Sequence, residues 1–259
     1  MIVNRGGSTH TTAGGRVEIY CEGDENSIDI NFYKTVLGQK ANQFEFKPVG
    51  SSNNLLCFAE TTLIRNGFCL IDRDYRTDEE VEKLEGKYKI KFLKVHEVEY
   101  FILNEKYLKQ LPNIKKDIDI NQKIEEVIDS LKLNFLADFL QFRINSYLEQ
   151  FPRINRLDNS EIIDFQQVQD LLFEKLDRNY TEVQNRISLI KNEKITAWLE
   201  EFEKLTFKQF PSKEIFDGLK SKIFNNAKKT SDIAKEIALL MEEDNYIPEE
   251  LETIFFPAT

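Results

Sequence analysis

Hydrophobic and polar positions follow two different spacings over the first 95 residues. Short runs rich in β-branched and aromatic residues predict strands, and the apolar positions between them lie three or four residues apart, which predicts helices. The predicted strands are RVEIYCEG (16–23), FEFKPVGS (44–51), FCLIDRD (68–74) and YKIKFLKV (88–95). The predicted helices are SIDINFYKTVLG (27–38), NNLLCFAETTLIRNG (53–67) and TDEEVEKLEG (77–86). This alternation predicts an α/β fold with a parallel sheet flanked by helices, in which the apolar third run is a central strand.

The second half of the chain has a different pattern. HEVEYFILNEKYLKQL (96–111) is expected to be helical, and strand signals fade after residue 112. From there, apolar residues at three- and four-residue spacing continue through most of the remaining chain. We therefore expect two domains, an α/β domain over residues 1–112 and an α-helical domain over residues 113–259.

Two of the predicted strands end on carboxylates. Glu22 closes the first strand, and Asp72 with Asp74 closes the third. Ligands of parallel α/β sheets bind beyond the carboxyl ends of the strands, so neighbouring strands would bring these three acids together. Their repulsion is relieved by shared protons or by a divalent cation, and such a cluster suits metal-assisted attack on a phosphodiester. The alternative interpretation of Asp72 and Asp74 is a turn signal or a helix cap.

The composition restricts the metals that such a site can hold. The chain has only two histidines, His10 and His96, which excludes a histidine-rich site. Its three cysteines, Cys21, Cys57 and Cys69, lack CxxC spacing, which favours reduced thiols over a disulfide framework or a zinc site. Any metal would then be held mainly by oxygen, as Mg²⁺ or Mn²⁺ prefers.

Net charge and hydropathy narrow the class of protein further. The formal net charge is −10, and the surplus acid lies mainly after residue 112, where 20 Lys and Arg face 28 Asp and Glu. This balance gives no support for a basic nucleic-acid track, although it does not exclude a local one. No apolar run reaches the roughly 18 residues that span a bilayer, and the N-terminal stretch lacks the apolar core of a signal peptide. We expect a cytoplasmic protein with no membrane association.

The residues around the acids resemble a known family. The Glu-Gly pair after the first predicted strand and IDRD after the third are similar to the TOPRIM domain, which topoisomerases, bacterial primases and OLD-type nucleases share. YCEGDENSIDINFY and HEVEYFIL most resemble the TOPRIM-like proteins encoded beside ABC-type ATPases in bacterial defence loci, such as the AriB-type effectors of PARIS anti-phage systems. The resemblance covers about residues 16–110. It implies a TOPRIM-like parallel sheet flanked by helices, followed by an α-helical C-terminal domain.

The resemblance also implies roles for individual acids. Glu22 matches the general acid/base or metal-bridging glutamate of the family, and Asp72 and Asp74 match its Mg²⁺-binding pair. Glu99, in EVEYF, resembles the acid at a helix start that adds a further ligand in OLD-like members. Here Tyr100 stands where those members usually have asparagine.

Other positions match the family less directly. Many relatives carry a second acid four residues after the first glutamate, where this chain has Asn26; Asp29 either takes that role or caps a helix. Gly50 stands where the family has a turn that opens a helix, either to meet a phosphate or with a simple serine cap. Lys213 resembles a lysine at a helix start, with Ser212 replacing glycine. It is either a charge stabiliser for the scissile phosphate or a solvated lysine.

The function that the resemblance implies is a Mg²⁺-dependent (or Mn²⁺-dependent) nuclease that is the toxic effector of an anti-phage system. An ABC-type ATPase sensor is the implied partner, RNA the favoured substrate with tRNA as a candidate, and a homodimer the active form. The helical domain would be the dimer interface or the docking surface for the ATPase. The alternatives are a catalytically silent TOPRIM-like regulator of the ATPase and a DNA-nicking nuclease.

Overall fold

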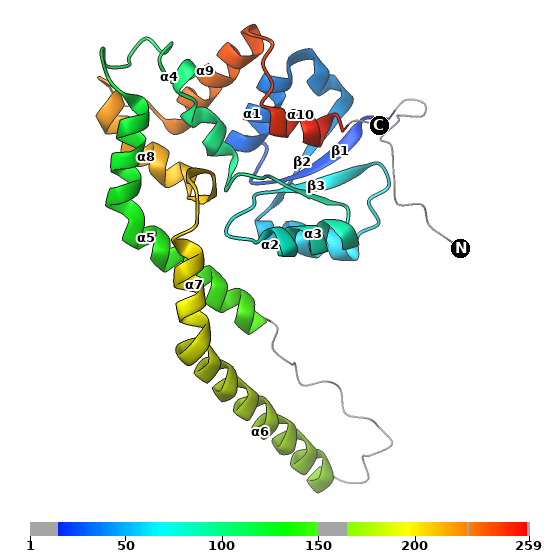
Figure 1. The fold of residues 1–259 in the computed structure, drawn as a ribbon. Coiled ribbons are helices and arrows are strands. Elements are labelled where there is room, and N and C mark those ends of the chain that lie inside the picture. The colour runs from blue at the N-terminus through cyan, green and yellow to red at the C-terminus, as the bar shows by residue number, and fades with distance from the viewer. Residues whose placement is uncertain (1–14, 150–164, 227, 258–259) are drawn as a thin grey trace. The chain divides into compact units, whose positions relative to one another are not determined.

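A four-stranded parallel sheet forms the centre of the α/β part. The structure, a computed structural model, describes residues 15–149, 165–226 and 228–257. The strand order is β2-β1-β3-β4, and each neighbouring pair is parallel; Figure 1 labels the first three strands along the chain. The strands are β1 (Val17–Glu22), β2 (Phe44–Gly50), β3 (Gly67–Ile71) and β4 (Ile90–Phe92). The predicted α/β class, the parallel sheet and the central position of the third strand are confirmed.

Three capped helices flank the sheet. They are α1 (Ile28–Leu37), α2 (Ser52–Thr61) and α3 (Asp78–Lys87), with α1 on one face and the other two on the opposite face (Figure 1). The side chain of Ser27 caps α1 and that of Ser51 caps α2, which satisfies backbone N–H groups that have no partner within the helix. Thr77 and Glu80 form a reciprocal capping box at the start of α3.

The second helix is shorter than its pattern predicts. It ends at Thr61, whereas the sequence indicated a helix up to Gly67. Gly67 instead begins β3 and pairs with Glu18 of β1. A Cβ atom on Gly67 would lie 1.9 Å from the Glu18 carbonyl oxygen, so the glycine permits a close approach of two backbones and does not terminate a helix.

The segment after β4 is less regular than a single helix. It contains the 3₁₀ helix η2 (Val98–Leu103) and the short helix α4 (Glu105–Leu108), which begins at the side-chain cap Asn104. Most of η2 is buried, including Glu99. Of the helix expected over residues 96–111, only two short pieces are present, at 98–103 and 105–108.

The chain forms two compact units that do not divide at residue 112. One consists of the described parts of Met1–Leu131 and Thr206–Thr259, and the other is Lys132–Leu205. The remaining elements are the 3₁₀ turns η1 (Gly38–Gln43) and η5 (Phe207–Gln209), the π segment η4 (Ile190–Lys194), and the helices α5 (Ile120–Glu149), α6 (Phe165–Leu189), α7 (Ile195–Phe202), α8 (Ser212–Ile223), α9 (Thr230–Glu243) and α10 (Glu249–Phe255). Within Lys132–Leu205, Phe139 packs against Phe202 with ring centroids 5.6 Å apart.

The last three helices belong to the same unit as the sheet. Helix α9 packs against α1, and α8 packs against η2. Phe255 of α10 lies with its ring centroid 5.2 Å from Phe44 and 5.7 Å from Tyr33. These contacts bury apolar faces that each element alone would expose to water, which is why the sheet unit includes residues from the end of the chain. No helix within the described ranges is long and apolar enough to cross a membrane.

Candidate functional site

Two adjacent strands deliver Glu22 and Asp72 to one edge of the sheet. Glu22 is the last residue of β1, and Asp72 follows the last residue of β3. Because β1 and β3 are parallel neighbours, with Tyr20 opposite Cys69, their carboxyl ends lie at the same edge. The Oε1 atom of Glu22 is buried and has no hydrogen-bond partner. Glu22 thus has an acceptor that the protein itself leaves unused, which is costly in a buried carboxylate.

Burial and mutual repulsion act on these carboxylates. Burial raises the pKa of Asp72 well above its usual range, and the charges of Asp29 and Glu22 raise it further. Burial also raises the pKa of Glu22, with the charge of Asp74 adding to it, while backbone N–H groups of Asp72 and Ser52 oppose the shift. The electrostatic interactions show that these acids lie close enough to disfavour one another's charged forms.

Asp29 belongs to the same cluster and does not cap its helix. Ser27 provides the cap of α1, while Asp29 lies in the first turn, partly buried. Burial, followed by the charges of Glu99 and Glu22, raises the pKa of Asp29 to about 7. A carboxyl group with this pKa exchanges protons near neutral pH, as a general acid or base requires.

Two glutamates come from the segment after β4. Glu99 is 6% exposed, and its burial raises its pKa. Burial raises the pKa of Glu97 to about 8, and the charge of Glu99 contributes to this shift. The Glu97 carboxylate accepts a hydrogen bond of 2.6 Å from the backbone N–H of Lys213 at the start of α8. Glu99 was predicted from the sequence, whereas Glu97, an acid of the same HEVEY run, was not.

Asp74 is held in an unusual conformation by Arg76. The φ angle of Asp74 is 50°, in the left-handed region that non-glycine residues rarely adopt. Its Oδ2 atom lies 2.5 Å from Nη1 of Arg76, and its backbone N–H donates to the His96 carbonyl oxygen at 3.2 Å. Sequence analysis missed Arg76, for which the only signal was a basic residue two positions after an acid.

Lys213 lies in the first turn of α8, and Gly50 ends β2 just before the Ser51 cap of α2. The Lys213 side chain is exposed, and its charge lowers the pKa values of Asp29, Glu97 and Glu99 relative to burial alone. Gly50 has φ of 96° and accepts a 2.7 Å hydrogen bond from the backbone N–H of Gly23. The serine cap expected after Gly50 is present, because the Ser51 side chain accepts from Asn54 N–H.

The carboxylate oxygens of these acids suit a hard divalent cation, but the acids do not form a complete coordination shell. Across the part of the chain that the structure describes, no three His, Cys, Asp or Glu residues form a ready group for a metal ion. Asp74 is engaged by Arg76, and Glu97 by the Lys213 backbone. The oxygen-only set, the mutual repulsion and the unpartnered Oε1 of Glu22 nevertheless fit a cation of the Mg²⁺ or Mn²⁺ type.

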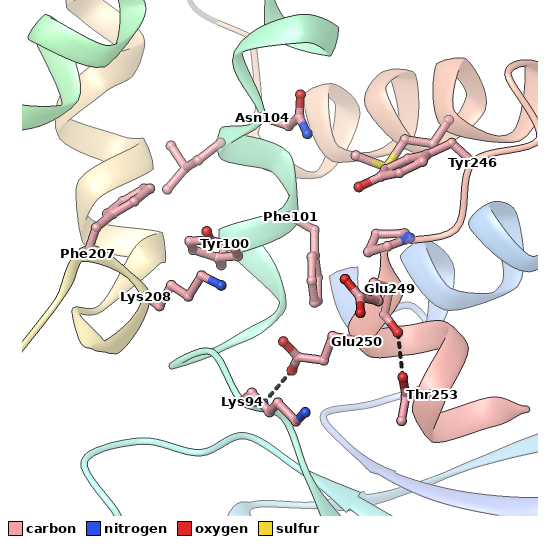
Figure 2. A pocket seen from close by; sticks show the side chains of 13 residues that line it. Lys94, Tyr100, Phe101, Asn104, Phe207, Lys208, Tyr246, Glu249, Glu250 and Thr253 are labelled. Carbon is pink, nitrogen blue, oxygen red and sulfur yellow. Dashed lines mark hydrogen bonds between the residues drawn. The ribbon is translucent and has the colours of Figure 1, made fainter. Parts of the chain in front are cut away.

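A separate pocket lies beside η2. Its volume is about 400 Å³, and none of the clustered acids lines it. Figure 2 shows Tyr100 and Phe207 on one side and Glu250 near Lys94. Glu250 accepts a hydrogen bond from the Lys94 backbone N–H, so this acid anchors the start of α10 to the chain after β4.

Comparison of the chain with protein-family models, with curated proteins and with solved structures found no match. The TOPRIM resemblance therefore stays a prediction from the motifs. The geometry of the carboxylates is the independent observation that bears on chemistry.

Proposed function

We propose that this protein is a metal-dependent nuclease of the TOPRIM-like type, with its active site at the carboxyl edge of the sheet. The observation that supports this most is the crowding of Asp29, Asp72 and Asp74 near Glu22, whose buried Oε1 atom has no hydrogen-bond partner. Stability alone does not favour such crowding, because each raised pKa reflects a charge that the fold disfavours. Function is the reason to retain it.

The proposed roles combine what the resemblance implies with the position of each side chain. Glu22 and Asp72 would hold the cation, together with Asp74 once it is free of Arg76, with Glu99 as a further ligand. When bound, Mg²⁺ polarises a phosphodiester and lowers the pKa of a water nucleophile. Asp29, with a pKa of about 7, would take up or return a proton at the reacting group. The ammonium of Lys213 would offset charge on the phosphate.

The biological setting of this proposal rests on the resemblance. We propose RNA, with tRNA as a candidate, as the substrate, a toxic effector role in anti-phage defence, release from an ABC-type ATPase partner, and a cytoplasmic homodimer as the active form. The surplus of 28 Asp and Glu over 20 Lys and Arg after residue 112 favours a partner with basic patches.

The first test is a cleavage assay of the purified protein on total tRNA and plasmid DNA, with Mg²⁺ or Mn²⁺ and with EDTA. We expect tRNA cleavage that requires the metal and falls at least about 100-fold in Asp72→Ala, because a lost metal ligand removes transition-state stabilisation. Asp232→Ala, an exposed aspartate at the start of α9, is the matched control and should keep full activity.

Other outcomes of this assay separate the alternatives. Cleavage of plasmid alone would assign a DNA-nicking nuclease. If neither substrate is cut, the assay is repeated in cells that carry the ATPase partner, with Glu22→Gln as the comparison. Toxicity that survives Glu22→Gln would contradict the enzymatic proposal and point to a silent regulator, because this substitution removes the charge of Glu22 while keeping its size.

A further inference from the structure

We propose that Arg76 and the divalent cation compete for the carboxylate of Asp74, so that Arg76 keeps the metal site incomplete until a cation displaces it. This inference rests on the proposed function, since it concerns the same site. Arg76 is thereby a positioning residue that acts through Asp74. Its guanidinium is bound to the Oδ2 atom of Asp74, one of the two oxygens with which this carboxylate would bind a cation.

The contacts of Arg76 show a guanidinium fixed from several directions. Nη1 lies 2.5 Å from Oδ2 of Asp74 and 3.3 Å from the carbonyl oxygens of Asp72 and Arg73. Nη2 lies 3.3 Å from Oγ of Ser52 at the start of α2. The Arg76 side chain is 10% exposed and that of Asp74 31% exposed, so water replaces these contacts poorly. Asp74 is thus held more firmly than an exposed ion pair would hold it.

The backbone conformation of Asp74 is consistent with a side chain that its neighbours hold in one position. A left-handed φ at an aspartate costs on the order of 1 kcal/mol, less than at most residue types, and two contacts of Asp74 favour its present conformation. One such contact is the hydrogen bond from the Asp74 N–H to the His96 carbonyl oxygen. The other is the ion pair with Arg76. Loss of the ion pair would free the carboxylate to turn toward Glu22 and Asp72.

The neighbouring arginine provides an internal contrast. Arg73 lies in the same loop, but its Nη2 atom pairs with Asp78, whose side chain is 86% exposed, at 2.5 Å. Its Nε donates to the Arg76 carbonyl oxygen at 3.1 Å. Removing either arginine changes the net charge of the loop by the same amount. Only the loss of Arg76 releases Asp74, so the two substitutions separate direct competition from a general charge effect.

The test is Mn²⁺ binding to the full chain, followed by the electron paramagnetic resonance signal of free Mn²⁺. We expect Arg76→Gln to bind Mn²⁺ about tenfold more tightly than the wild type, because a charge-assisted hydrogen bond no longer opposes the ligand. Arg73→Gln should stay within about twofold of the wild type. In an Asp74→Asn background, Arg76→Gln should give no further tightening, because the contested carboxylate is gone.

Folding of each variant is checked by circular dichroism before titration. If Arg76→Gln does not fold, Arg76→Lys replaces it. We then expect binding about threefold tighter than in the wild type, because an ammonium cannot reproduce the planar contacts of the guanidinium.

Each outcome of the titration has one interpretation. Equal binding by the wild type, Arg76→Gln and Arg73→Gln would overturn the competition while leaving the proposed metal site intact. Tightening of the same size in both arginine variants would also overturn it, in favour of a general charge effect. No Mn²⁺ binding by any variant would contradict the proposed metal site itself, and the competition with it.

Discussion

At the scale of single residues, the acids at the sheet edge make the protein sensitive to pH. A carboxyl group with a raised pKa binds more protons in the folded chain than in the unfolded chain. Its contribution to stability is therefore complete below its unfolded pKa and is lost as the pH rises through its folded pKa. For Asp29 that window runs from its ordinary 3.8 to about 7, and for Glu97 it extends from 4.5 to about 8.

We predict that the metal-free protein becomes less stable between pH 5 and pH 8. A single group such as Asp29 changes the free energy of unfolding by at most about 1.4 kcal/mol per pH unit within its window. Asp29→Asn should reduce the slope and raise the stability at pH 8, because the disfavoured charge is absent. The measurement is urea unfolding in EDTA at several pH values, with Asp24→Asn, an exposed aspartate before α1, as the control. A wild-type profile that is flat over this range would contradict the prediction.

At the scale of elements, the alignment of β1 with β3 determines where Glu22 and Asp72 meet. Gly67 makes that alignment possible, because a side chain there would collide with the Glu18 carbonyl oxygen. Gly86, near the end of α3, differs, since nothing lies within 4 Å of the position of a Cβ atom. A side chain would therefore collide with the backbone at Gly67 but would meet open space at Gly86. The sequence alone does not distinguish these two positions.

We predict opposite effects for the two Gly→Ala substitutions. Gly67→Ala should destabilise the protein by about 3 kcal/mol, because β1 and β3 must separate. Gly86→Ala should stabilise it by about 0.5 to 1 kcal/mol, because alanine loses less backbone entropy in a helix. Denaturant unfolding of both variants is the measurement. Similar stability changes in the two variants would show that the close approach at Gly67 does not hold in solution.

At the scale of the whole molecule, the end of the chain completes the core around the sheet. Phe255 is 4% exposed and contacts Tyr33 of α1 together with Phe44 and Phe46 of β2. Phe255 thereby adds to the apolar cover that Tyr33 of α1 provides over the edge strand β2.

We predict that Phe255→Ala costs about 3 kcal/mol, because it leaves a cavity among aromatic side chains. Leu63→Ala is the control: Leu63 is 79% exposed, so its loss should change the free energy of unfolding by less than about 0.5 kcal/mol. Thermal and denaturant unfolding would measure both. An equally small effect of Phe255→Ala would mean that α10 is not part of the sheet unit in solution.

The sequence by itself determined the starts of the flanking helices, the strands of the sheet and the strand-end acids. Helix caps and strand patterns depend on residues within a few positions, so Ser27, Thr77 and the alternating run of β1 could be recognised directly. The order of strands and helices also predicted a parallel sheet, because parallel strands need helical connections. That order placed Glu22 and Asp72 at the carboxyl ends of two strands, and they meet because the structure makes β1 and β3 neighbours.

Only the tertiary structure decided which distant segments reach that edge. Glu97 and Lys213 lie 116 positions apart, and their contact depends on the packing of α8 against η2. The pairing of Asp74 with Arg76 and not with a neighbouring basic side chain likewise depends on the buried surroundings that Ser52 and Phe92 provide. Burial of apolar surface drives this packing, and it has no preferred direction and no fixed spacing along the sequence. A pattern of residues along the chain therefore cannot specify which polar groups the packing brings together.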